Sequence, residues 1–194
     1  GTRFLVADRI HDAFVEAFGR RASQLRVGDP EDPSTDDGPV ISAASKARYL
    51  EHVRHALADG ARLVCGGIES ALAQRLRAGH FVSPTVVADV TPDMRLFREE
   101  VFGPVAPVMR FSTLDEAARL AADTEYGLAL GILTSNPLKA LELADRIPSG
   151  IVHINDQTVN DEAQIPFGGV GASGTGSRFG GAEANIEAFT ETQW

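Results

Sequence analysis

The sequence has little cysteine, a deficit of basic residues and no long apolar run. Its one cysteine, Cys65, cannot form an internal disulfide, which is typical of proteins from a reducing compartment. The 18 basic residues against 27 acidic ones give a formal charge of -9, which argues against nucleic acid as a partner. No apolar run approaches the ~20 residues of a membrane span, and the first residues do not resemble a signal peptide. We therefore expect a cytoplasmic protein that binds neither nucleic acid nor a membrane.

The composition is that of an ordinary folded domain, because 43% of the 194 residues are hydrophobic and 23% are charged. Helical spacing of apolar residues predicts a helix over residues 11–25. Its apolar face would comprise Ile10, Phe14, Phe18 and Leu25. Ser42 can cap a second helix. The buried stripe of that helix would comprise Leu50, Val53 and Leu57.

Short apolar segments between the helices predict strands. In the first half these are residues 4–6, 62–65 and 81–90, and Pro84 favours a sheet edge or a bulge for the third. In the second half, residues 105–111, 128–134 and 151–154 alternate with two capped helices. This alternation with short connections predicts an α/β fold with a parallel sheet. Residues 189–194 alternate like a strand, which could complete a sheet in another subunit.

A glycine-rich stretch separates the last two predicted strands, and residues 169–174 match the dinucleotide pattern G-x-G-x-x-G. That pattern binds phosphate only between a strand and a helix N-terminus. Here no helical run follows Gly174. A close-packed glycine loop is therefore the better interpretation, although the long loop itself favours a functional role.

Few residues are candidates for chemistry on spacing alone. Glu99 and Glu100 are consecutive, so in an extended segment their carboxylates point to opposite sides, and solvated surface charges are the simplest interpretation. Glu100 and Phe102 would share one side of a strand, where a carboxylate could bind a ribose diol and a ring could pack on a flat group.

The histidines and the cysteine give weaker signals. His52 and His55 are three residues apart on a predicted helix, but no further ligands have matching spacing, so we predict surface histidines and no metal site. Cys65 has no neighbouring basic residue that would lower its pKa, which favours a buried structural thiol over a nucleophile. The residues alone thus predict an α/β domain with a possible nucleotide edge and no catalytic nucleophile.

Several segments in order resemble the aldehyde dehydrogenase superfamily. Residues 98–104 read R-E-E-V-F-G-P, close to its E-E-[IV]-F-G-P signature. The other matching segments are V-G-D-P at 27–30, G-P-V-I at 38–41, T-E-Y-G-L at 124–128 and P-F-G-G at 166–169. The resemblance covers the whole chain. It implies the parallel-sheet catalytic domain of that α/β fold over residues 1–187, followed by a C-terminal oligomerisation strand over residues 188–194.

The resemblance implies oxidation of an aldehyde to the acid with NAD or NADP through a cysteine thioester. It assigns the carboxylate that holds the nicotinamide ribose to Glu100 and the aromatic ring beside it to Phe102. It also places Leu128 near the nicotinamide and Phe167 in the aldehyde pocket. The family's nucleophilic cysteine would fall just before Gly1 and its glutamate base further upstream, so no catalytic residue is assigned here and we expect the chain alone to be inactive.

Residues 153–164 are similar to the branch of the family that acts on aromatic aldehydes such as salicylaldehyde, benzaldehyde or vanillin. We therefore expect an aromatic aldehyde as substrate and a homo-oligomer as the assembly. Two alternatives remain: a non-catalytic association module, and an acylating enzyme that transfers the acyl group to coenzyme A.

Overall fold

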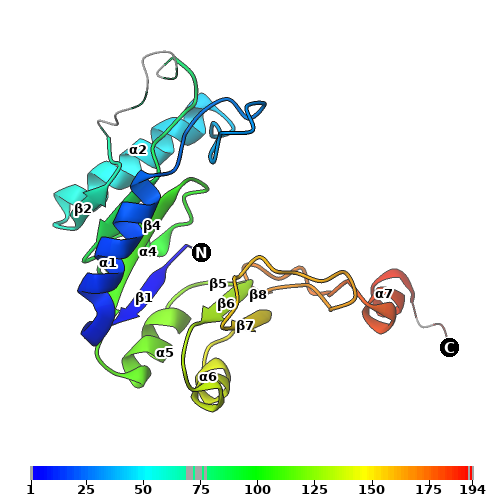
Figure 1. The fold of residues 1–194 in the computed structure, drawn as a ribbon. Coiled ribbons are helices and arrows are strands. Elements are labelled where there is room, and N and C mark those ends of the chain that lie inside the picture. Colours follow the sequence, from blue (N-terminus) through cyan, green and yellow to red (C-terminus); the bar gives the residue numbers. More distant parts are fainter. Residues whose placement is uncertain (1, 69–71, 73–75, 77, 192, 194) are drawn as a thin grey trace. The chain divides into compact units, whose positions relative to one another are not determined.

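The computed structural model describes residues 2–68, 72, 76, 78–191 and 193. The chain divides into two compact units, Gly1–Thr113 and Leu114–Trp194 (Figure 1). Both units combine helices with parallel strand pairs, which confirms the predicted α/β class. Within the described residues, no helix is both long enough and apolar enough to cross a membrane.

The first unit is built on a four-stranded sheet. Its strands are β1 (Phe4–Ala7), β2 (Arg62–Cys65), β3 (Thr85–Ala88) and β4 (Val105–Phe111), in the order β1-β4-β3-β2. β4 is parallel to both β1 and β3, whereas β2 is antiparallel to β3. Of the two alternatives predicted for the Pro84 segment, the sheet edge is wrong, because β3 lies inside the sheet. The bulge agrees with the register shift between Leu63 and Cys65 of β2, where β2 pairs with β3. Pro84 immediately precedes β3, so the missing N–H leaves the hydrogen-bonded ladder intact.

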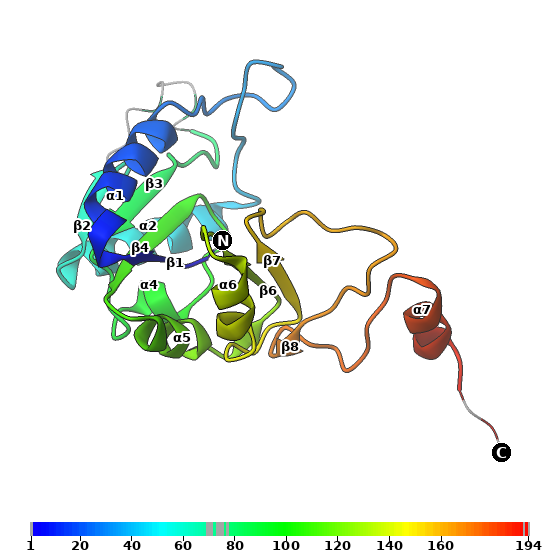
Figure 2. The same cartoon turned by 60° about the horizontal axis from the view of Figure 1, so that its bottom comes forward.

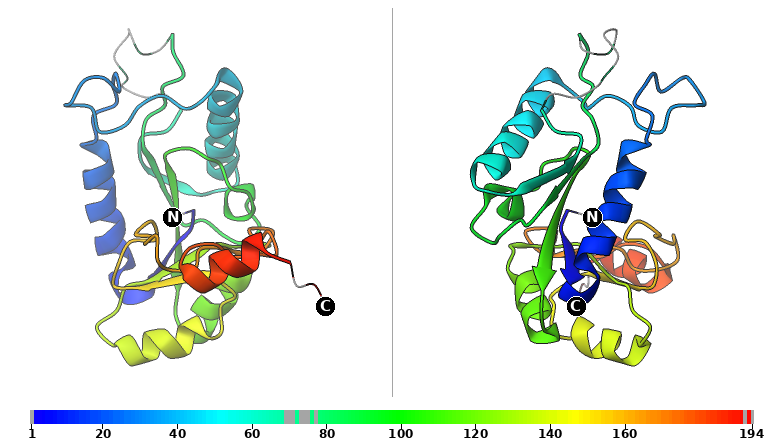
Figure 3. Two further views of the ribbon diagram at one scale, coloured as in Figure 1. Left: turned by 90° about the vertical axis from the view of Figure 1, so that its right-hand side faces the viewer. Right: turned by 60° about the vertical axis from the view of Figure 1, so that its left-hand side comes forward.

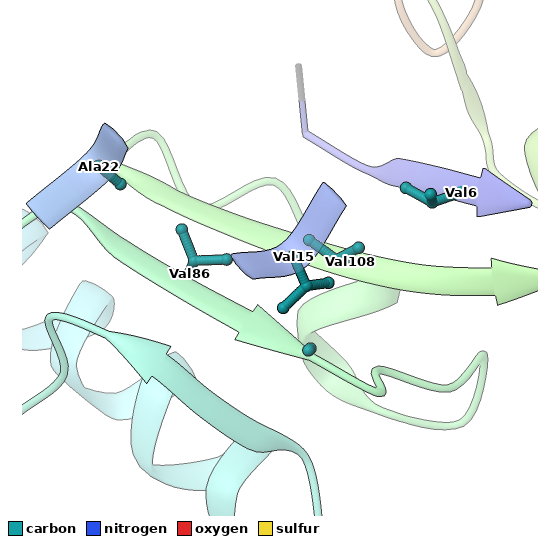
Figure 4. Packing of buried hydrophobic residues seen from close by; sticks show 6 residues of the cluster. Val6, Val15, Ala22, Val86 and Val108 are labelled. Atoms are coloured by element: carbon teal, nitrogen blue, oxygen red, sulfur yellow. The ribbon is translucent and has the colours of Figure 1, made fainter. Parts of the chain in front are cut away.

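Helices α1 (Asp8–Ser23) and α2 (Ala43–Ala58) cover opposite faces of this sheet (Figure 3). The core beneath α1 is apolar and consists of β-branched and small side chains (Figure 4). It comprises Val6, Val15, Ala22, Val86, Ala88 and Val108. Gly19 lets α1 approach β2, since an added Cβ would lie 2.5 Å from Cγ1 of Val64.

The predicted apolar face of α1 is displaced by one residue. Ile10 and Leu25 are 49% and 44% exposed, whereas Phe14 and Phe18 are partly buried against the core. The fully buried stripe comprises His11, Val15, Gly19 and Ala22. Both stripes have helical spacing, and the sheet selects the one whose small residues permit close contact.

α2 begins at Ser42, whose hydroxyl accepts a hydrogen bond from the N–H of Ser45, as predicted. The buried face differs from the predicted Leu50–Val53–Leu57 stripe, because only Val53 of the three is fully buried. The fully buried residues are Tyr49, His52, Val53 and Ala56. The prediction that His52 is a surface residue is therefore wrong, whereas His55 is exposed. α2 contacts the short helix α4 (Arg95–Arg98).

The second unit contains two small sheets. Its elements are α5 (Leu114–Ala122), β5 (Tyr126–Gly127), β6 (Ala129–Ile132), α6 (Pro137–Ala144), β7 (Ile151–Ile154), β8 (Val170–Gly171) and α7 (Ala182–Phe189). β6 and β7 pair in parallel and are joined through α6 (Figure 2), while β5 and β8 pair antiparallel. The Asn136 side chain caps α6 by accepting a hydrogen bond from the N–H of Lys139, and Pro137 follows, as predicted.

The long glycine-rich loop has two arms that run side by side (Figure 1). Phe167 and Phe179 exchange two backbone hydrogen bonds, and the N–H of Gly181 donates to the carbonyl of Ala163. α7 follows the second arm. Phe189, the first residue of the predicted C-terminal strand, is instead the last residue of this helix.

The remainder of the predicted C-terminal strand lies only partly in the described residues. Residues 190, 191 and 193 are in no helix or strand, and residues 192 and 194 lie outside the described residues. The oligomerisation strand therefore stays a prediction.

Candidate functional site

The segment that carries Glu100 and Phe102 is an irregular loop that leaves α4. Glu99 ends the helix in an extended conformation, and residues 100–102 lie in no strand. The predicted strand geometry is therefore wrong for this segment. Val101 is buried, whereas the Phe102 side chain is 76% exposed and its backbone has a φ of 53°. The loop thus anchors itself through Val101 and presents Phe102 to the outside.

Two residues of α2 hold this loop. Nη2 of Arg48 donates hydrogen bonds to the carbonyl oxygens of Glu100 and Val101, at 3.3 and 2.9 Å. The Tyr49 ring lies against Gly103, where an added Cβ would be 2.8 Å from Cδ2 of the ring. Arg48 thus binds the main chain of Glu100 and leaves its carboxylate available to a ligand.

Tyr49 is itself fixed in the interior. Its hydroxyl oxygen lies 2.6 Å from both the carbonyl of Ser83 and Oγ1 of Thr85, and burial raises its pKa above the ordinary value. The N–H of Thr85 donates to the carbonyl of Pro104 at 2.8 Å. The far end of the loop is therefore tied to the same strand that binds Tyr49.

Glu99 is the third fixed point of the loop. Its Oε1 accepts a hydrogen bond from Nε of Arg95 at 2.7 Å, and its Oε2 lies 3.4 Å from Nε2 of His52. Arg95 also reaches Glu51 on α2, with Nη1 and Oε1 2.9 Å apart. The hydrogen bond from Arg95 lowers the pKa of Glu99, so its carboxylate is ionised at neutral pH. Glu99 therefore belongs to an ion network and is more than the solvated surface charge that the sequence indicates.

In the second unit, Leu128 and Phe167 are linked through Gly150. Leu128 is 40% exposed between β5 and β6, and its carbonyl accepts a hydrogen bond from the N–H of Ile151 at 2.9 Å. Gly150 packs so closely on the next segment that an added Cβ would lie 1.8 Å from the carbonyl oxygen of Gly168. The Phe167 ring packs on Phe179, with centroids 5.4 Å apart.

Arg178 ties these two segments together. Its Nη1 donates to the carbonyl of Gly150 at 3.1 Å and to that of Gly168 at 2.8 Å. The guanidinium therefore joins the residue that immediately precedes β7 to the loop that carries Phe167. The structure brings Leu128 and Phe167 onto one framework in this unit, while Glu100 and Phe102 share a loop in the other.

The G-x-G-x-x-G pattern forms a close-packed turn and no helix N-terminus. Val170 and Gly171 form β8, and an added Cβ at Gly169 would lie 2.4 Å from the carbonyl oxygen of Ser173. The next helix, α7, begins at Ala182. The prediction of a packed glycine loop is confirmed.

Cys65 lies on β2 in a half-buried position, and burial raises the pKa of its thiol. A raised pKa reduces the thiolate fraction at neutral pH, so Cys65 is poorly suited to act as a nucleophile. In the part of the chain that the structure describes, no group of three or more His, Cys, Asp and Glu side chains could hold a metal ion.

Sequence reasoning missed Arg48, Tyr49, His52 and Arg178 as residues of this framework. A signal for the α2 residues was present, because positions 49, 52, 53 and 56 follow helical spacing. The polar character of Tyr49 and His52 obscured it. Arg178 gave no signal, since its two acceptors are backbone carbonyls far away in the sequence.

Comparison with known proteins agrees with this architecture. The family model described as "Aldehyde dehydrogenase family" matches residues 1–194, and the chain belongs to the aldehyde dehydrogenase family. It is 50% identical over 192 residues to a vanillin dehydrogenase of an Amycolatopsis species, covering 99% of this chain and 38% of the relative. It is 41% identical over 192 residues to an NAD(+) benzaldehyde dehydrogenase of Pseudomonas putida, again covering 99% and 38%.

Solved structures of the family have the same fold. A betaine aldehyde dehydrogenase of Staphylococcus aureus in complex with NAD+ has a TM-score of 0.92 and 35% identity, covering 100% of this chain and 38% of that one. A succinic semialdehyde dehydrogenase of Streptococcus pyogenes in complex with NADP+ has a TM-score of 0.83 and 37% identity, covering 92% and 38%. The chain thus spans about 38% of the length of the curated relatives that it matches.

Proposed function

We propose that this chain forms the coenzyme-facing and substrate-facing part of an enzyme that oxidises an aldehyde to the acid with NAD or NADP. The observation that carries the proposal is the loop at Glu100. A large aromatic ring is held outward on left-handed backbone beside an acidic residue whose main chain is fixed by Arg48. Backbone strain of this kind persists where the surrounding structure enforces it, and it concentrates at functional sites.

The loop has the chemistry that a nicotinamide nucleotide requires. Among the described residues the Glu100 carboxylate has no hydrogen bond or ion pair, so it can accept hydrogen bonds from the two ribose hydroxyls. The exposed Phe102 ring can pack on the neighbouring flat group. In the second unit, Leu128 is 40% exposed, and the resemblance to the family assigns it to the nicotinamide. The coenzyme, when bound, accepts the hydride that leaves the aldehyde carbon.

We further propose that the substrate is an aromatic aldehyde. The two curated relatives described above are a vanillin dehydrogenase and a benzaldehyde dehydrogenase. Phe167 would line the aldehyde pocket. Its ring packs on Phe179, and the carbonyl of the next residue, Gly168, accepts a hydrogen bond from Arg178. Residues 153–164 would shape the entrance.

The reaction needs a thiolate nucleophile and a base beyond the residues assigned here, because Cys65 is unsuited to the task. The chain by itself is therefore proposed to be inactive. In the cell it would act in the cytoplasm, as part of a homo-oligomer that residues 188–194 help to assemble.

A chimera tests this proposal. In the Amycolatopsis vanillin dehydrogenase, the segment that matches this chain is replaced by residues 1–194, and vanillin oxidation is measured with NAD and with NADP. We expect turnover in the chimera and none in the isolated chain. Replacing Glu100 by glutamine should raise the KM for the coenzyme by about tenfold and leave the KM for vanillin unchanged.

The control is Glu125→Gln, an exposed carboxylate outside the loop, which should change neither KM. Three outcomes would count against the proposal: a folded chimera without coenzyme-dependent oxidation, an unchanged coenzyme KM in Glu100→Gln, and a turnover that requires coenzyme A. The last would instead indicate an acylating enzyme.

A further inference from the structure

His52 is a buried imidazole without a conventional partner. Its side chain has no exposed surface, and neither ring nitrogen has a hydrogen-bond partner among the described residues. A polar group that leaves water without a partner destabilises the folded state. An apolar side chain at this position of α2 would avoid that cost, so the imidazole calls for an explanation other than packing.

The His52 ring has an ion-pair contact with the carboxylate of Glu99. Nε2 of His52 lies 3.4 Å from Oε2 of Glu99, just beyond the ordinary range of a hydrogen bond. The other oxygen of this carboxylate accepts the hydrogen bond from Arg95. The carboxylate therefore lies between a cation of α4 and the imidazole of α2, with one oxygen hydrogen-bonded to Arg95 and the other 3.4 Å from Nε2 of His52.

Glu99 is the residue at which the chain leaves α4. Its N–H still donates to the carbonyl of Arg95 at 3.0 Å, while its own backbone is extended. The direction of the chain at Glu99 determines where the next residue, Glu100, points. A restraint on the Glu99 side chain is consequently a restraint on the start of the loop.

α2 restrains the rest of the loop in the same way. Arg48 binds the carbonyls of Glu100 and Val101, and the Tyr49 ring lies against Gly103. His52 follows one turn later on the same face of α2. Three residues on two successive turns therefore contact the loop at its beginning, middle and end.

Resting on the coenzyme role proposed above for Glu100 and Phe102, we infer that His52 is a positioning residue that acts through the Glu99 carboxylate. It holds the start of the loop so that Glu100 and Phe102 are presented before the coenzyme arrives. Pre-organisation of this kind reduces the entropy lost on binding and therefore raises the affinity for the coenzyme.

The restraint can be measured on the 194-residue chain without any coenzyme, by hydrogen–deuterium exchange of peptides that cover residues 99–105. His52→Leu fills the site without a polar group, and it should speed exchange in this segment severalfold while α2 and β3 stay protected. His52→Gln keeps an N–H near the Glu99 carboxylate and should exchange like the unmodified chain. His80→Leu, at an exposed histidine outside this ion network, is the matched control and should have no effect.

Glu99→Ala approaches the same contact from the surface, because the Glu99 side chain is 48% exposed and its replacement leaves the core intact. It should speed exchange as His52→Leu does, and the double variant should exchange no faster than Glu99→Ala alone. Independent, additive effects would overturn the inference, as would unchanged exchange in both single variants. If His52→Leu unfolds the chain, the inference is still overturned when residues 99–105 of Glu99→Ala exchange at the rate of the unmodified chain.

The chimera supplies the functional measurement. His52→Leu should raise the KM for NAD or NADP by about tenfold with little change in kcat, and His52→Gln should restore it. A change in exchange without a change in KM would separate the restraint from coenzyme binding and refute the positioning role. Failure of Glu100→Gln to alter KM, with exchange behaving as expected, would instead refute the proposed function.

Discussion

Phe102 combines two unfavourable features at a single residue. Its ring is 76% exposed, and its φ of 53° places a bulky side chain in a region that asparagine and glycine tolerate far better. Conformations of this kind cost about 1–3 kcal/mol each. Arg48, Tyr49 and buried Val101 enforce this one. The residue is therefore adapted to present its ring, at the expense of stability.

Substitutions at Phe102 separate the backbone strain from the function of the ring. Phe102→Asn should be at least as stable as the unmodified chain, because asparagine tolerates the left-handed region and little buried surface is lost. Phe102→Val should be less stable than Phe102→Asn by about 1 kcal/mol, because its branched Cβ clashes with this backbone. Urea denaturation measures both changes. Equal stabilities would show that the residue relaxes out of the left-handed region.

At the scale of elements, Gly150 and Arg178 hold the start of β7 against the glycine-rich loop of the second unit. β6 and β7 are short and pair only along four residues each, so they need support from the loop that returns as β8. Gly150 provides it by direct backbone contact with Gly168, and Arg178 by hydrogen bonds to both carbonyls. The position of Phe167 relative to Leu128 follows from this junction.

Gly150→Ala should destabilise the second unit by about 3 kcal/mol or more, because its Cβ would lie 1.8 Å from the carbonyl oxygen of Gly168 and neither backbone can move freely. The measurement is urea denaturation combined with hydrogen exchange in β6 and β7. Gly176→Asn is the control, since no atom lies within 4 Å of its added Cβ and asparagine tolerates positive φ. Similar stabilities for the two variants would contradict the assigned contact.

At the scale of the whole molecule, exposed carboxylates make the fold sensitive to acid. Four carboxylates have a pKa below the ordinary 3.8 or 4.5, and for each of them a hydrogen bond is the largest cause. Asp12 is bound by His11, Asp36 by the backbone N–H of Arg26, Glu99 by Arg95 and Asp156 by the Asn160 amide. Asp37 opposes them, because burial raises its pKa.

The sign of the effect follows from proton linkage. A lowered pKa in the folded state means that the unfolded chain binds more protons, so stability falls as the pH drops through 4.5 and 3.8. The urea midpoint should therefore decrease from about pH 6 to about pH 3. Asp12→Asn should make this decrease shallower. A midpoint that stays constant or rises toward acid pH would contradict the assignment.

The sequence by itself determined most of the elements and the family. Local signals were sufficient for the caps at Ser42 and Asn136, because a cap depends on residues within one turn. The signature at residues 98–104 was sufficient for membership, because it is a contiguous string. It also singled out Glu100 and Phe102, though with the wrong local geometry.

Only the tertiary structure decided how that string is held. The hydrogen bonds from Arg48 and the contact between His52 and Glu99 join segments about 50 residues apart, and no local pattern encodes such contacts. The left-handed backbone of Phe102 depends on the same surroundings. The same reason explains the misplaced apolar face of α1 and the misplaced edge at Pro84. Helical spacing allows neighbouring stripes, and a strand's position in a sheet depends on partners that the strand itself does not specify.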